Sequence, residues 1–82
     1  MFGLPDITVS HVGHYLYAST SEDRAVTRLL QSLPYSTLLA EDEMWKIPWS
    51  RQAKAILQSE DGNTAAIDFD GDWEADAPDA PN

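Results

Sequence analysis

The chain has 82 residues, of which 43% are hydrophobic and 10% aromatic, and a formal net charge of −9; these values predict one globular domain with a modest core. The absence of cysteine excludes a disulfide framework, a thiol nucleophile and a cysteine-based zinc site. No apolar run approaches the about 20 residues of a membrane span, and the start lacks a basic, apolar leader, so we expect a cytoplasmic protein that contacts no membrane.

The first part of the chain predicts a hairpin followed by a helix. Two runs of β-branched and aromatic residues around a glycine-containing turn predict strands near 6–11 and 14–19. An apolar stripe at helical spacing follows, formed by Val26, Leu29, Leu30 and Leu33. Pro34 ends this helix, and a capping box that begins at Ser19 or Thr20 is expected to start it.

The second part repeats the pattern and adds a strand. Short strands are expected at about 35–39 and 43–47, and Ser50 is expected to cap a helix over 50–58. The inward side of that helix is expected to carry Ala53, Ile56 and Leu57. The stretch TAAIDFD at 64–70 alternates apolar and polar residues, which is typical of a strand with one buried face.

The predicted order is therefore β-β-α-β-β-α-β. Such an order favours an α+β architecture, with two helices on one face of a mainly antiparallel sheet. We expect a single domain over residues 1–75. The remaining residues, 76–82, form an acidic tail of Pro, Ala and Asp that is expected to be disordered.

Residues 25–57, AVTRLLQSLPYSTLLAEDEMWKIPWSRQAKAIL, combine two motifs. A helix ends at Leu33–Pro34, and Trp45-Lys46-Ile47-Pro48 precedes a second helix. With the preceding hairpin, this pattern resembles the HARP (HepA-related) module found beside annealing helicases, and similar small modules of phage and plasmid proteins, over about residues 7–58. The resemblance implies an α+β module that engages DNA. Family members place basic residues near the positions that hold Tyr35 and the acidic run at 41–43 here.

The charge is concentrated near one end of the chain. Residues 55–82 hold eight acidic residues and no basic one, whereas residues 1–54 are almost neutral. Such a surface repels polyanions and attracts basic protein surfaces. The simpler alternative is an acidic end that only aids solubility.

The predicted partner-binding residues come from two regions. Asp68, Asp70, Asp72 and Glu74 are expected to lie about 6–7 Å apart along one strand face, a spacing that resembles that of a phosphate backbone. Trp49 and Tyr35 are candidate interface residues, since such aromatics are favoured at hot spots. Trp45, in phase with Ile47, is instead expected to anchor the core.

Catalytic and metal-binding signals are weak. Serines are frequent, but no nucleophile elbow, phosphate loop or paired-carboxylate signature accompanies them, so we predict no enzyme and no cofactor. The run DFDGDWEAD (68–76) lacks the glycine and glutamate positions of an EF-hand loop. His11 and His14 have no carboxylate or cysteine neighbours in sequence and are expected at the surface or at a sheet edge.

Two classes of function remain, with a third kept open. The first is an acidic, non-catalytic inhibitor of a basic nucleic-acid-handling protein, similar in kind to anti-CRISPR and other anti-defence proteins of phages that mimic DNA. The second is a HARP-like accessory module with direct nucleic-acid contacts. Those contacts would come from Arg24, Arg28, Lys46, Arg51 and Lys54. The third is a plain oligomerisation or scaffold module.

Overall fold

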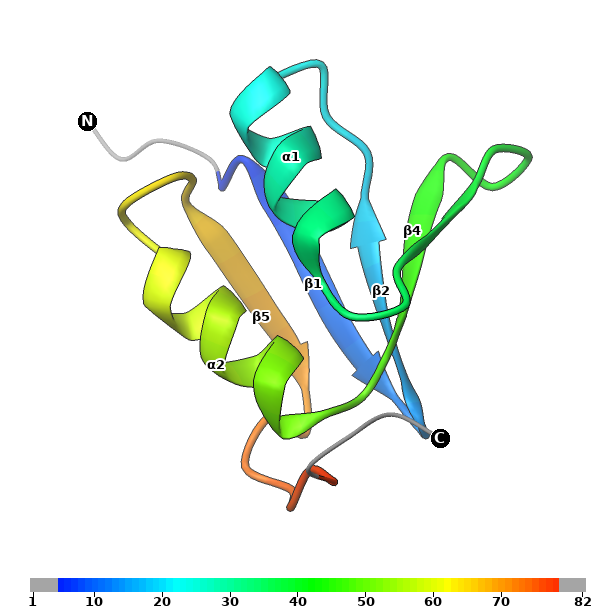
Figure 1. Ribbon diagram of the computed structural model, residues 1–82, viewed down its shortest axis with the longest axis vertical. Helices are drawn as coiled ribbons and strands as arrows, with labels where there is room; N and C mark the ends of the chain where they lie inside the picture. The colour runs from blue at the N-terminus through cyan, green and yellow to red at the C-terminus, as the bar shows by residue number, and fades with distance from the viewer. Residues whose placement is uncertain (1–4, 79–82) are drawn as a thin grey trace.

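Strands and helices follow one another in the predicted order β-β-α-β-β-α-β. The structure is a computed structural model that describes residues 5–78. Its elements are β1 (Ile7–Val12), β2 (Tyr15–Ser19), α1 (Arg24–Ser32), β3 (Thr37–Leu39), β4 (Met44–Pro48), α2 (Arg51–Glu60) and β5 (Ile67–Gly71). Both helices lie on the same face of one sheet (Figure 1), which confirms the predicted α+β class.

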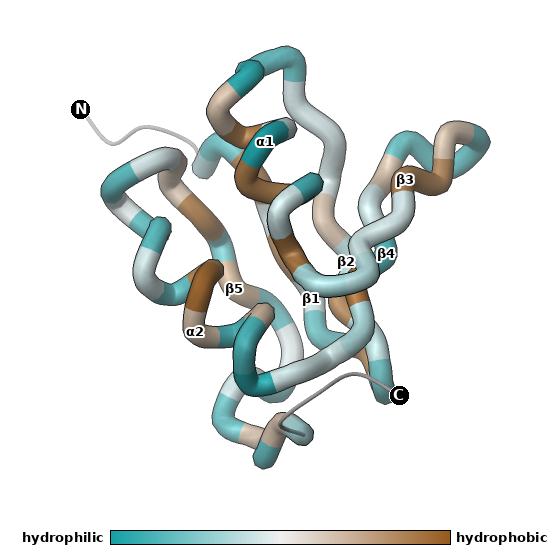
Figure 2. Tube along the Cα trace, in the orientation of Figure 1, coloured by the Kyte–Doolittle hydropathy of each residue, from teal (hydrophilic) through white to brown (hydrophobic). Residues whose placement is uncertain are grey.

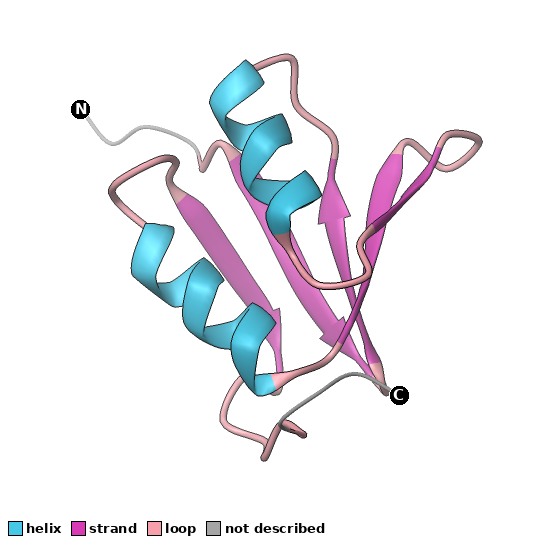
Figure 3. Cartoon of the chain, in the orientation of Figure 1, coloured by secondary structure: helices cyan, strands magenta, loops and turns pink. Residues whose placement is uncertain are grey.

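The five strands lie in the order β3-β4-β2-β1-β5. All neighbouring pairs are antiparallel except β1 and β5, which are parallel. The last strand therefore joins the sheet beside the first, and Ser10 lies next to Asp70 although they are 60 residues apart. Strands β3 and β5 form the two margins, as the cartoon in Figure 3 shows.

The core lies between the sheet and the helices. Most of the alternate strand residues that face α1 and α2 are buried, and the hydrophobic stretches in Figure 2 lie on these elements. Trp45 and Ile47 of β4 are 7% and 0% exposed, which confirms the prediction that Trp45 anchors the core.

The opposite sheet face is covered by neither helix. We call it the open face. It carries the residues that alternate with the core positions, namely Thr8, Ser10, Val12, Tyr15, Tyr17, Ser19, Thr37, Leu39, Met44, Lys46, Pro48, Asp68 and Asp70. Each of them is half-buried or exposed.

Helix α1 begins later than predicted. Asp23 is its N-cap, and its carboxylate accepts a hydrogen bond from the Ala25 backbone N–H at 2.8 Å. Ser19 is not available for this role because it belongs to β2, where its hydroxyl accepts from the Thr8 N–H at 3.2 Å. The predicted capping box at Ser19 or Thr20 is thus wrong, since the strand continues through the first of these residues.

Helix α2 begins where the sequence predicts. Ser50 is its N-cap, is fully buried, and accepts a hydrogen bond from the Ala53 N–H at 3.1 Å. We expect Ser50→Ala to lower the free energy of unfolding by about 1–2 kcal/mol, because it leaves a buried N–H unsatisfied. Urea denaturation would measure this. The exposed cap variant Asp23→Ala should cost less, and the reverse ranking would contradict this account.

Two strands are shorter than predicted. Strand β3 starts at Thr37, because Tyr35 takes a left-handed conformation (φ 58°) in a turn in which the Ser36 N–H donates to the Leu33 carbonyl. Strand β5 starts at Ile67, whose N–H donates to the Asp61 carboxylate of the preceding turn. Of the helices within residues 5–78, none is long and apolar enough to cross a membrane.

Candidate partner-binding surface

The predicted row of four carboxylates is only half formed. Asp68 and Asp70 are exposed and share the open face of β5, as the alternation predicts. Strand β5 ends at Gly71, however, so Asp72 and Glu74 lie in the following turn. The prediction of four carboxylates evenly spaced along one strand face is wrong, although all four side chains are exposed.

The chain reverses at Gly71 because Trp73 turns back against the domain. Gly71 has φ +87°, and the Trp73 indole N–H donates to the Asp70 carbonyl at 2.7 Å. The Trp73 ring packs edge-on against Phe69, with 4.6 Å between ring centroids, and is 9% exposed. Asp72 and Glu74 therefore stand on either side of a buried anchor at the margin of the sheet.

Trp49 is buried and does not offer the surface that the interface hypothesis requires. It is 6% exposed. Its ring stacks on His11 with 4.0 Å between centroids and meets Trp73 edge-on at 5.3 Å. Trp49 is buried because side chains alternate between the two faces of a strand. It lies two residues after Ile47 and four after Trp45, and therefore on the same buried face.

Tyr35, the other predicted interface aromatic, is 77% exposed. It lies in the turn between α1 and β3, whereas Trp49 follows β4 and packs against His11 and Trp73. Of the two candidate interface aromatics, Tyr35 is exposed and Trp49 is buried.

Residues 72–78 form a segment that crosses the end of the domain, here called the C-terminal strap. Its backbone carbonyls accept hydrogen bonds from three places in the fold. The Trp49 indole N–H donates to Asp76 (3.2 Å), and the Arg51 backbone N–H donates to Pro78 (2.7 Å). The His11 Nδ1 atom lies 2.5 Å from the Asp72 carbonyl oxygen.

The strap was not predicted, and it includes the first residues of the expected tail. Residues 76–78 contact the domain through the bonds above and through Ala77, which packs against the core. The disorder expected for 76–82 thus does not begin at residue 76, and residues 79–82 lie outside the described part of the chain. Trp73 is the sequence signal for the strap, since a large apolar side chain interrupts an acidic run.

Two hollows lie beside the strap, and the wider one, of about 550 Å³, runs along strap residues 75–78 and reaches His11 and Trp49. The other, of about 260 Å³, is lined by His14, Tyr15, Pro48, Trp49 and Pro78. Across residues 5–78, no three His, Asp or Glu side chains gather in a group that could hold a metal ion. His14 is exposed, whereas His11 is half-buried against Trp49.

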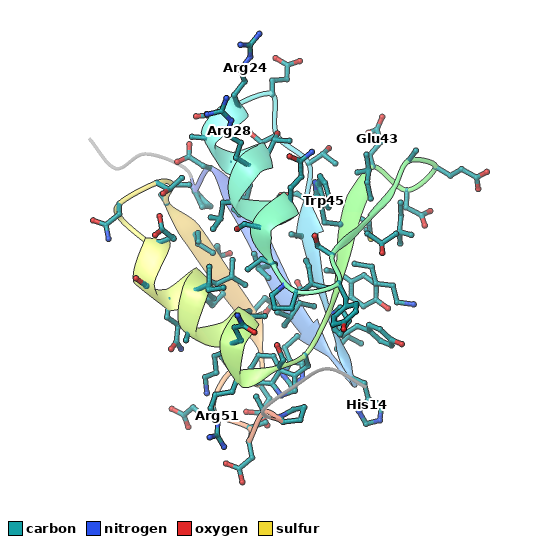
Figure 4. All side chains as sticks on the ribbon, in the orientation of Figure 1. His14, Arg24, Arg28, Glu43, Trp45 and Arg51 are labelled. Atoms are coloured by element: carbon teal, nitrogen blue, oxygen red, sulfur yellow. The ribbon has the colours of Figure 1, made fainter. Side chains whose placement is uncertain are left out.

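The five basic residues do not form one patch. Arg24 and Arg28 lie on α1 at one end of the molecule, and Arg51 lies at the opposite end (Figure 4). Lys46 is on the open face, with its Nζ 4.1 Å from the centroid of the Tyr15 ring. Lys54 on α2 lies over Trp49 at 5.6 Å.

Together, these elements form a two-layer α+β domain with two exposed carboxylates on β5 and two more in the turn that follows it. Comparison of the chain with protein-family models, curated proteins and solved structures finds no match.

Proposed function

We propose that this protein is a non-catalytic inhibitor that uses its acidic β5 margin to bind the basic surface of a nucleic-acid-handling protein. Its action would resemble that of the anti-CRISPR and other anti-defence proteins of phages that mimic nucleic acid. The observation that carries the proposal is the exposure of Asp68 and Asp70 on the marginal strand β5 and of Asp72 and Glu74 in the turn that follows it.

The carboxylates are free to meet a partner because the fold makes little use of their side chains. Asp70 accepts one long hydrogen bond from the Ser10 hydroxyl, at 3.4 Å. At Asp72 it is the backbone carbonyl, not the carboxylate, that holds the strap. The negative electrostatic potential of these carboxylates attracts a basic partner. It can raise the association rate constant to about 10⁸–10⁹ M⁻¹s⁻¹ at low salt.

The proposed mimicry is one of charge rather than of regular spacing. Only Asp68 and Asp70 follow the strand, and the reversal at Gly71 carries the other two carboxylates around the margin. A basic channel that binds this protein would therefore need basic groups that reach both the carboxylates on the strand and those beyond Gly71. Such a fit suits a concave channel better than a flat surface.

We expect the fourfold variant Asp68→Asn, Asp70→Asn, Asp72→Asn, Glu74→Gln to weaken partner binding at least about tenfold, chiefly through a slower association rate. The partner is first captured from the native host with the wild-type chain and identified by mass spectrometry. Its association rate with each variant is then measured by surface plasmon resonance at two salt concentrations.

A charge-matched control separates a specific surface from net charge. It neutralises four other exposed acidic residues, Glu22, Glu41, Asp42 and Glu43, and should leave the association rate within about threefold of wild type. Equal losses in both variants would contradict a defined binding surface. Tight binding of the wild-type chain to bare DNA or RNA at ordinary ionic strength, abolished by Arg24→Ala and Arg28→Ala, would favour the HARP-like alternative.

A further inference from the structure

The open face holds a row of side chains that is complementary to itself. The strand register places Lys46 beside Tyr17, Tyr17 beside Ser10, and Ser10 beside Asp70. This row runs across four adjacent strands, β4-β2-β1-β5. Its basic end and its acidic end are about 14 Å apart, three strand spacings of about 4.8 Å.

We propose that the open face binds the open face of a second copy of this chain. The twofold axis would run parallel to the strands, between β1 and β2. This rotation exchanges β4 with β5 and β2 with β1, because they lie symmetrically about the axis. Lys46 of each copy then faces Asp70 of the other, and Tyr17 faces Ser10, so that each contact is made twice.

The next row supports the same arrangement. Val12 pairs with Tyr15 across β1 and β2, so the rotation places Val12 of one copy over Tyr15 of the other. Val12 is 60% exposed, one of the largest exposures of an apolar residue within residues 5–78. Two sheets that pack face to face are rotated by about 30° relative to each other. This rotation shifts Lys46 of one copy by only about 4 Å from its position over Asp70 of the other, a distance that a lysine side chain can span.

The axis also keeps the acidic margins apart. The two β5 strands would lie on opposite sides of the interface, about 14 Å from each other when projected on the sheet. This exceeds the Debye length of about 8 Å in physiological salt. Each β5 margin instead lies over the β4 strand that carries Lys46.

A single-stranded nucleic acid is the alternative occupant, since Tyr15 and Tyr17 could stack with bases. The charges argue against it. Lys46 is the one basic residue of the open face, which also carries Asp68 and Asp70. In the proposed dimer Asp70 faces Lys46 and Asp68 faces Met44, whereas a polyanion would be repelled by both carboxylates.

The inference does not rest on the proposed inhibitor function, although the two surfaces share Asp68 and Asp70. The dimer would cover Asp68 and Asp70, so a partner could reach these two carboxylates only on the monomer, but it would leave Asp72 and Glu74, which lie beyond the strand, outside the interface. Variants at position 46 should therefore weaken self-association without weakening partner capture. Neutralising residues 72 and 74 should do the opposite, so each proposal can fail alone.

Charge reversal provides the test, read by sedimentation velocity over a concentration series in low salt. Wild type should dimerise. Lys46→Glu should weaken the dimer at least about tenfold, as should Asp70→Lys, because each creates two like-charged contacts. An equimolar mixture of the two variants should restore dimers, since every 46–70 contact then joins opposite charges.

Arg24→Glu makes the same charge change as Lys46→Glu on the helical layer and should leave the dimer unchanged. Circular dichroism checks that each variant is folded. Wild type that stays monomeric up to about 1 mM overturns the proposal, as does a dimer that neither reversal weakens. A monomer that binds oligothymidine through Lys46 also overturns it and assigns the face to nucleic acid.

Discussion

Replacing Trp49 by alanine is expected to lower the free energy of unfolding by about 3–5 kcal/mol. The side chain is 6% exposed and fills the space between His11, on which it stacks, and Trp73, which it meets edge-on. Its indole N–H also holds the strap through the Asp76 carbonyl. Urea denaturation followed by circular dichroism would measure the loss.

Two further variants make the result interpretable. Trp49→Phe keeps an aromatic ring but removes the hydrogen bond to Asp76, so we expect a folded protein that is about 1–2 kcal/mol less stable. Tyr35→Ala changes a side chain that is 77% exposed, and we expect an effect within about 0.5 kcal/mol. If Trp49→Ala cost no more than Tyr35→Ala, Trp49 would be a surface residue and the packing described above would be wrong.

Local periodicity explains why the architecture could be predicted. The alternation in β1, β2 and β4 and the spacing of α1 each follow from neighbouring residues, and together they define which faces must be buried. The same rule applied one step further would have placed Trp49 in the core, because it continues the alternation of Trp45 and Ile47 past Pro48. The proline and the predicted helix start led to the interface hypothesis instead.

The shape of the candidate surface depends on long-range contacts, which no local sequence pattern predicts. Strand β5 pairs with β1 in parallel, which places Gly71 beside His11. That pairing, and the return of Trp73 to the core, end the strand before Asp72 and create the strap. Composition predicted an acidic surface at this end of the chain, but the direction of its carboxylates required the long-range fold.

Substituting alanine for Gly71 should destabilise the domain by about 2–4 kcal/mol, from two combined causes. Its φ of +87° disfavours any residue with a side chain, and an added Cβ would lie 2.4 Å from the backbone oxygen of His11. That oxygen belongs to the sheet register, so it can move only if the β1–β5 pairing changes. The strap would then lose its starting point at Asp72.

Gly62 supplies the matched control for this prediction. Its φ of +83° is similar, but an added Cβ would have no atom within 4 Å. Gly62→Ala should therefore cost only the backbone strain, about 1 kcal/mol, and the difference between the two variants isolates the steric term. Hydrogen exchange at the amides of β5 would locate the damage, since protection should fall there in Gly71→Ala and persist in Gly62→Ala. Equal unfolding free energies for the two variants would mean that β5 does not approach β1 at Gly71, and the reversal that positions Asp72 and Glu74 would have to be abandoned.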